Sequence, residues 1–111
     1  TFGASSFKLD QSGLGEQVET INTEAVNHAR AAAGPQHYVA GDLGPVGEML
    51  APLGSMTVEQ AKAIYVNQVG MIEAAGVDLY LIETIFDLNE AIIAIAAVQA
   101  ASSATWALYS A

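Results

Sequence analysis

One pattern constrains the fold of this chain more than any other, because it occurs twice: a short apolar run, a carboxylate, a turn and then a capped helix. The first apolar run covers residues 38–41 and leads to Asp42, and the second covers residues 79–82 and leads to Glu83. Apolar runs that alternate with helices are typical of βαβ units with a buried parallel sheet. Such folds carry their chemistry at the C-terminal ends of the strands, so the pattern places Asp42 and Glu83 at that edge.

Local signals give the order of the other elements. We expect a loop over residues 1–15, a helix over 16–33, a strand over 37–41, a long loop over 42–56, a helix over 57–75, a strand over 78–82, a helix over 87–101 and a last strand over 105–110. Thr57 and Gln60 have the spacing of a capping box, and Asp87 and Glu90 have the same spacing. Gly76 suits the left-handed position that ends a helix. The order predicts one α/β domain over residues 1–111.

The first two long helices each carry an apolar stripe at helical spacing. In the first helix the stripe is Val18, Ile21, Ala25, Ala29 and Ala32. In the second it is Val58, Ala61, Tyr65, Gln68 or Val69, and Ile72. We expect these stripes to face the sheet or a neighbouring helix.

The third long helix differs, because the stretch from Ala91 to Val98 is apolar on every side. A helix that is apolar all round is usually buried. We therefore expect its outer side to contact another subunit or domain. The alternative is an alanine-rich surface with little consequence.

Composition narrows the function classes. Twelve acidic residues against three basic ones give a net charge of −9, which disfavours binding to nucleic acid or to an anionic membrane surface. The chain has no cysteine and two histidines, too few ligands for a typical structural zinc site. No basic segment with an apolar core opens the sequence, and no apolar run reaches the roughly 18 residues of a membrane span. The cytoplasm is the expected compartment.

Three runs along the chain carry a resemblance to a known family. They cover residues 1–5 (TFGAS), 39–47 (VAGDLGPVG) and 76–84 (GVDLYLIET), and residues 52–54 (PLG) fit the same pattern. In this order they resemble the homocysteine S-methyltransferase family, most of all the homocysteine-binding domain of cobalamin-dependent methionine synthases. The resemblance implies an α/β fold of the TIM (β/α)8 barrel type. A full barrel needs roughly 250 residues, so the chain would form less than half of one, about strands two to five.

The resemblance also implies a reaction, in which a methyl group passes to the sulfur of homocysteine and gives methionine. In the family, a zinc ion held by three cysteines binds the thiol and lowers its pKa. Methylcobalamin recharged by methyltetrahydrofolate, betaine or S-methylmethionine could be the methyl donor, and the likeness favours the cobalamin type. Because this chain has no cysteine, we expect no zinc ligand and no catalytic residue within it.

Four residues are candidates for binding homocysteine. The resemblance implies that Glu83 receives the amino group, since an ammonium group needs an anionic acceptor; the alternative is a carboxylate that caps a helix or forms a salt bridge. Thr84 would flank the same pocket, and Thr1 would end strand two at its mouth. Asp42 either lines the pocket or organises the following loop through an Asx-turn. Ser110 would end the last strand at the same rim, in a structural role.

Two functions follow from these observations. The first is a fragment of a methyltransferase that acts on the zinc-activated thiol of homocysteine, with catalysis by the complete protein and not by these 111 residues alone. The alternative is a short, non-catalytic half-barrel that assembles with itself or with a partner subunit, because open sheet edges favour assembly.

Overall fold

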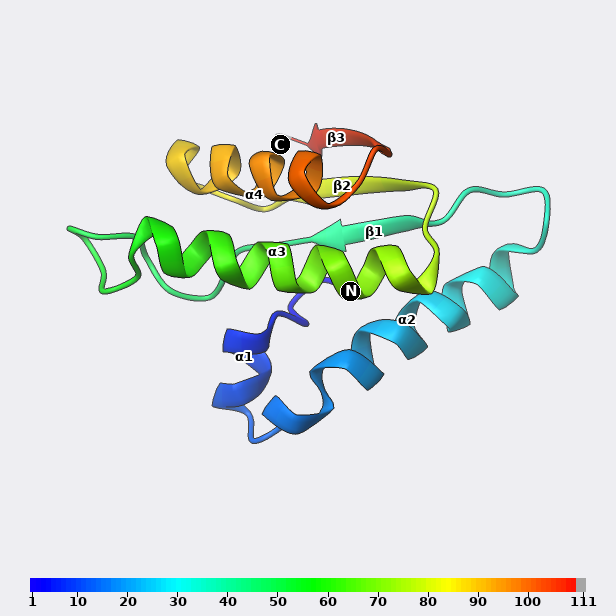
Figure 1. Ribbon diagram of the computed structural model, residues 1–111, viewed down its shortest axis with the longest axis horizontal. Helices are drawn as coiled ribbons and strands as arrows, with labels where there is room; N and C mark the ends of the chain where they lie inside the picture. Colours follow the sequence, from blue (N-terminus) through cyan, green and yellow to red (C-terminus); the bar gives the residue numbers. More distant parts are fainter. Residues whose placement is uncertain (110–111) are drawn as a thin grey trace.

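The computed structural model describes residues 1–109. Helices and strands alternate along the chain (Figure 1). In order they are α1 (Ser6–Gln11), the 3₁₀ helix η1 (Gly15–Gln17), α2 (Val18–Ala33), β1 (Ala40–Leu43), α3 (Val58–Ala75), β2 (Leu79–Glu83), α4 (Leu88–Ala101) and β3 (Thr105–Tyr109). None of the helices in this part of the chain is both long and apolar enough to cross a membrane.

The three strands form one parallel sheet in the order β1-β2-β3. Asp42 of β1 is in register with Leu81 of β2, and Glu83 of β2 is in register with Tyr109 of β3. Helices α3 and α4 lie side by side in front of the strands in Figure 1. The α/β class and the parallel sheet are thus confirmed, and the open sheet of strands joined by helices is consistent with part of a (β/α)8 barrel.

The two faces of the sheet have different surroundings. Tyr80 and Ile82 of β2 are fully buried against the helices, whereas the alternate residues Leu81 and Glu83 are half-exposed. Asp42 of β1 is also half-exposed and lies on the same face as Leu81, its partner in register. In a closed barrel the face away from the helices lines the interior. Asp42 and Glu83 therefore share the face that would point inward.

Helix α3 is central to the core. Its buried residues are Ala61, Tyr65, Gln68, Val69 and Ile72, which confirms the expected stripe except at Val58, whose side chain is 51% exposed. The capping box is present: Thr57 Oγ1 accepts from the Gln60 backbone, and Gln60 Oε1 accepts from the Thr57 backbone. Gly76 follows in the left-handed conformation (φ 96°) and ends the helix, as expected.

Close packing between β1 and α3 depends on the absence of a side chain at Gly41. A Cβ there would lie 2.6 Å from Cγ2 of Ile72 and 3.1 Å from the ring of Tyr80. The Tyr80 ring therefore lies across β1, and its hydroxyl reaches Oε2 of Glu73 at 2.7 Å.

The N-terminal segment is more ordered than expected, because α1 forms where a loop was predicted. Ser5 caps this helix, its Oγ accepting from the backbone of Lys8 at 3.3 Å. The stripe predicted for the next helix is partly wrong: α2 buries Val18, Asn22 and Val26, while the alanines at positions 29 and 32 are exposed. Asn22 was missed because its amide is polar, yet that amide is hydrogen-bonded inside the protein.

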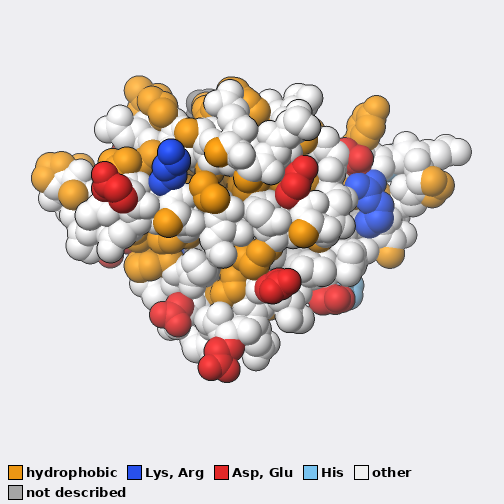
Figure 2. Space-filling view, in the orientation of Figure 1, with side chains coloured by type: hydrophobic (Ala, Val, Ile, Leu, Met, Phe, Trp, Pro, Cys, Tyr) orange, Lys and Arg blue, Asp and Glu red, His pale blue; other side chains and the backbone are white. Residues whose placement is uncertain are grey.

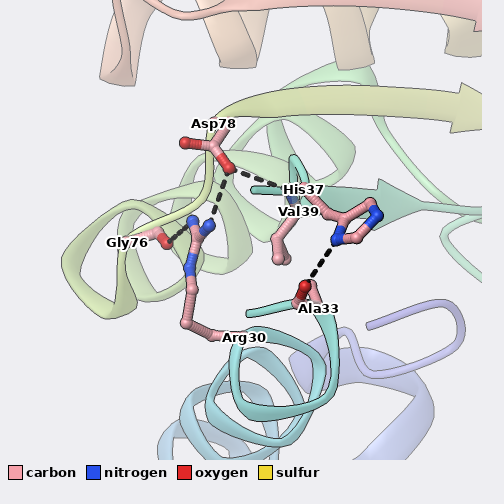
Figure 3. A network of polar contacts seen from close by, with 6 residues as sticks. All are labelled: Arg30, Ala33, His37, Val39, Gly76 and Asp78. Carbon is pink, nitrogen blue, oxygen red and sulfur yellow. Dashed lines mark hydrogen bonds and ion pairs between the residues drawn. The ribbon is translucent and has the colours of Figure 1, made fainter. Parts of the chain in front are cut away.

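The first strand begins later than predicted, at Ala40 instead of residue 37. Val39 donates its backbone N–H to Oδ2 of Asp78 at 2.8 Å, so a side chain occupies the position of a strand partner. The same carboxylate forms an ion pair with Arg30 of α2, whose guanidinium also donates to the carbonyl of Gly76 (Figure 3). This network fastens α2 to the N-terminal ends of β1 and β2, opposite the edge that carries Asp42.

Helix α4 packs against α3 and contacts β2, and its buried apolar residues are Ala91, Ile93, Ala94, Ala97 and Val98. Its start confirms Asp87 as the capping residue, with Oδ1 accepting from Asn89 at 2.8 Å. Ile92 is 54% exposed and lies on the outer side. The expected contact of this side with another subunit or domain stays a prediction.

Candidate functional site

The carboxyl groups of Asp42 and Glu83 come together on the open face of the sheet. Asp42 lies one residue from the end of β1, and Glu83 is the last residue of β2. In the register of the sheet Glu83 is two residues beyond Leu81, the partner of Asp42, so both side chains emerge on the same face of neighbouring strands. Glu83 acts on Asp42 through side-chain hydrogen bonding and through its charge, and both raise the pKa of Asp42, so the two carboxyls can share a proton.

The surroundings of Asp42 raise the pKa of its carboxyl group well above the ordinary value. The pKa of Asp42 is raised from 3.8 to about 7, first by burial and then by side-chain hydrogen bonding to Glu83 and the Glu83 charge, while the amino group of Thr1 lowers it. Two carboxyls this close titrate as a unit. Oδ1 of Asp42 is buried and has no hydrogen-bond partner among the described residues. The pair thus combines negative charge with an acceptor atom that lacks a donor.

Thr1 lies against the backbone of Asp42. Its hydroxyl donates to the Asp42 carbonyl at 2.7 Å and accepts from the Asp42 N–H at 2.8 Å. The hydroxyl hydrogen is therefore engaged, and Thr1 takes the place of a strand partner on the outer edge of β1. The structure forms no strand at residues 1–4, so the expected position of Thr1 at a strand end stays a prediction, as does direct binding of substrate by Thr1.

Thr84 follows Glu83 in an unusual backbone conformation. Its φ is +62°, and its side chain is exposed. A β-branched residue rarely occupies the left-handed region, where it costs of order 1–3 kcal/mol, and such residues cluster at functional sites. The sequence carried no signal of this strain, because threonine in a turn is ordinary. Thr84 is next to Glu83 in the chain, and its expected place beside a ligand pocket stays a prediction.

A second polar cluster lies nearby and was missed from the sequence. Glu90, only 6% exposed, accepts on Oε1 from the Val46 backbone at 2.6 Å and from the Tyr65 hydroxyl at 2.8 Å. Its spacing from Asp87 suggested a capping role, but the carboxylate instead holds the long loop after β1. Only the tertiary fold brings these residues together.

The long loop also borders a cavity of about 850 Å³. The cavity lies between residues 45–53 and 86–90, and the exposed side chains of Met49, Leu53, Phe86 and Leu88 are among those that line it. Neither Asp42 nor Glu83 lines it. The cavity is therefore separate from the carboxyl pair.

The described residues do not offer the three-cysteine donor set for the zinc ion that the sequence resemblance implies. The chain has no cysteine, and within residues 1–109 no three His, Asp or Glu side chains are grouped so that they could hold a metal.

Carboxylates are scattered among apolar and neutral atoms on the helical face, with few basic groups between them (Figure 2). Ser110 lies outside the described residues.

The class of this protein is α/β: an open parallel sheet of three strands that alternate with helices, consistent with part of a (β/α)8 barrel, with two carboxyl groups at its C-terminal edge. The model of the family described as homocysteine S-methyltransferase matches residues 1–110. The chain therefore belongs to the homocysteine S-methyltransferase family. A search of curated proteins gave no match.

Proposed function

We propose that the Asp42–Glu83 pair binds the ammonium group of homocysteine in a methyltransferase that converts homocysteine to methionine. The observation that carries this proposal is the buried Oδ1 of Asp42, an acceptor without a donor, next to a second carboxyl. An ammonium group offers three N–H donors and a positive charge. Charge-assisted hydrogen bonds to carboxylates are the strong kind, and the family membership names a substrate that carries such a group.

In this proposal the described residues bind and orient the substrate. Asp42 and Glu83 hold the amino end, Thr84 borders them, and Thr1 fixes the backbone of Asp42. Methyl transfer to sulfur is an in-line displacement, for which orientation of the reactants supplies much of the rate. The thiol end would extend away from the pair, toward parts of the barrel that these residues do not form.

The zinc cysteines and the methyl-donor site would come from outside these 111 residues. The half-exposed face of the sheet supports this proposal, because Leu79 and Leu81 are apolar and nothing in the described part of the chain buries them fully. Parallel sheets are normally covered on both faces. Methylcobalamin recharged by methyltetrahydrofolate is the proposed donor, and the cytoplasm the proposed compartment.

Substrate recognition can be tested by calorimetric titration with homocysteine and with 4-mercaptobutyrate, which lacks the amino group. Glu83→Gln should weaken homocysteine binding by roughly 10-fold to 100-fold, the value of a charged hydrogen bond, and leave 4-mercaptobutyrate unaffected. Glu59→Gln, at an exposed carboxylate in the first turn of α3, is the matched control. Equal losses for both ligands, or no loss with Glu83→Gln, would remove the assignment.

A second candidate is the half-barrel that assembles without catalysis. The uncovered sheet face favours it, as does Ile92, which is 54% exposed on the outer side of α4. If α4 forms the contact, Ile92→Glu should shift an oligomer toward the monomer in sedimentation velocity. A monomer before and after the substitution would reject that contact.

A further inference from the structure

We propose that Gln68 is a positioning residue for the carboxyl pair: it holds the backbone of Thr1, and Thr1 in turn fixes Asp42 beside Glu83. The inference rests on the proposed function, because it concerns the geometry with which the pair meets an ammonium group. Gln68 is in α3, and its side chain is 2% exposed. It lies outside the pair, so any effect on a ligand must pass through other residues.

Two buried amides hold the N-terminal segment in place. Nε2 of Gln68 donates to the carbonyl of Thr1 at 2.9 Å and to Oδ1 of Asn22 at 3.2 Å. Nδ2 of Asn22 donates to the carbonyls of Ala4 and Val18, both at 2.8 Å. Gln68 of α3 therefore holds the first residue of the segment 1–4, and Asn22 of α2 holds the last.

The hydroxyl group of Thr1 connects this N-terminal segment to Asp42. Strand β1 is at the edge of the sheet, so its outer side has no strand partner among the described residues. There the Thr1 hydroxyl bonds both the carbonyl (2.7 Å) and the N–H (2.8 Å) of Asp42. Without Thr1 in this place, the Asp42 backbone would lose both of these hydrogen bonds on the outer side of β1. The direction in which Asp42 presents its carboxyl to Glu83 therefore depends on Thr1.

The buried amide of Gln68 is unusual at its position, because neighbouring buried residues of α3 include the apolar residues Val69 and Ile72. An apolar residue there would leave the Thr1 carbonyl without its donor, which is costly in the interior. The simplest alternative is that Gln68 only satisfies this carbonyl and contributes to stability. The two explanations differ in what happens to Asp42 when Gln68 is replaced.

The pKa of Asp42 depends on its burial and on the position of Glu83, so it can be used to follow the geometry of the pair. The groups that act on Asp42 are Glu83 on β2 and the amino group of Thr1; burial and both effects of Glu83 raise its pKa, and the weaker effect of the amino group lowers it. Loosening Asp42 would expose it and separate it from Glu83. The pKa of Asp42 should then fall toward its ordinary value.

The experiment uses Gln68→Met, which keeps the length of the side chain and removes the donor. The Asp42 carboxyl is followed by NMR titration in the ligand-free protein, and homocysteine binding is measured by calorimetry. We expect the Asp42 midpoint to fall by about one unit and the affinity to drop about tenfold. Tyr80→Phe is the matched control, because it removes the buried hydrogen bonds of Tyr80 to Val69 and Glu73 without touching Thr1.

The outcomes separate the two proposals. If Gln68→Met matches Tyr80→Phe in both midpoint and affinity, Gln68 has only a structural role and the inference is wrong. If the midpoint shifts but Glu83→Gln leaves homocysteine affinity unchanged, the proposed function fails while the positioning of the pair stands. Should Gln68→Met not fold, Thr1→Val must reproduce the shift and Thr1→Ser, which keeps the hydroxyl, must not; equal behaviour of these two variants overturns the inference.

Discussion

Asp42 and Glu83 lie on the same face of two neighbouring parallel strands, because Glu83 is two residues beyond Leu81, the partner of Asp42 in register. An isolated aspartate would be ionised at neutral pH, but Asp42 lies beside a second carboxyl group. Burial, the hydrogen bond and the Glu83 charge raise the pKa of Asp42 from 3.8 to about 7. Stability and ligand binding should therefore both depend on pH in this range.

The free energy of unfolding should fall as the pH rises from about 4 to about 7. In this window the folded protein keeps a proton on Asp42 that the unfolded chain has lost, since the pKa of Asp42 is raised from 3.8 to about 7 by folding. Urea unfolding of the wild type and Asp42→Asn at several pH values isolates the effect. The stability of the wild type relative to the variant should decline across the window; parallel curves would contradict the raised pKa.

Gly41→Ala should destabilise the protein by about 1–3 kcal/mol, the usual cost of overpacking a core. The new Cβ would lie 2.6 Å from Cγ2 of Ile72. Gly70→Ala, on α3, is the control, since a Cβ there meets nothing within 4 Å and alanine favours the helix by about 0.8–1.0 kcal/mol. The two variants should change the urea midpoint in opposite directions, and a loss of stability in both would refute the packing argument.

Tyr65→Phe should cost about 1–3 kcal/mol, because it leaves buried acceptors without their donor. The Tyr65 hydroxyl lies 2.8 Å from Oε1 of Glu90 and 2.9 Å from the carbonyl of Gly44. Burial and the Glu90 charge raise the pKa of Tyr65, so the hydroxyl stays protonated and donates. Hydrogen exchange at the Val46 amide, which also bonds Glu90, should become faster. Unchanged stability and exchange would show that the long loop is held by other contacts.

Thr84→Gly should leave the protein at least as stable as the wild type. Relief of the left-handed conformation at Thr84 (φ +62°) returns about 1–2 kcal/mol, against about 0.5–1 kcal/mol lost to the flexibility of glycine. Thr20→Gly, at an exposed position of α2, has no strain to relieve and should lower the thermal midpoint. A larger loss at Thr84 than at Thr20 would show that the observed conformation is not strained.

The sequence predicted those features that are determined locally. The capping box of Thr57 and Gln60 and the end of a helix at Gly76 involve neighbouring residues, and both are confirmed. The apolar run before Glu83 predicted a buried parallel strand, and the structure has that strand one residue later, with Glu83 at its end. The place of both carboxylates at one edge followed from the parallel order alone.

The sequence did not predict the features that depend on tertiary contacts. The predicted start of β1 was wrong because the side chain of Asp78, which is distant in sequence, accepts the hydrogen bond from the Val39 N–H. The inward position of Asn22 was missed because only the folded chain supplies the carbonyl of Ala4 as its partner. The effect of Glu83 on the pKa of Asp42 likewise depends on the register of two strands, which no local pattern determines.

The most direct test is a crystal structure of the protein with homocysteine bound at pH 7.5. The account predicts that the homocysteine nitrogen lies about 2.7–2.9 Å from a carboxylate oxygen of both Asp42 and Glu83, the range of charge-assisted hydrogen bonds, with the sulfur directed away from them. A nitrogen bound elsewhere, or a homocysteine carboxylate or thiol in its place, would contradict the account.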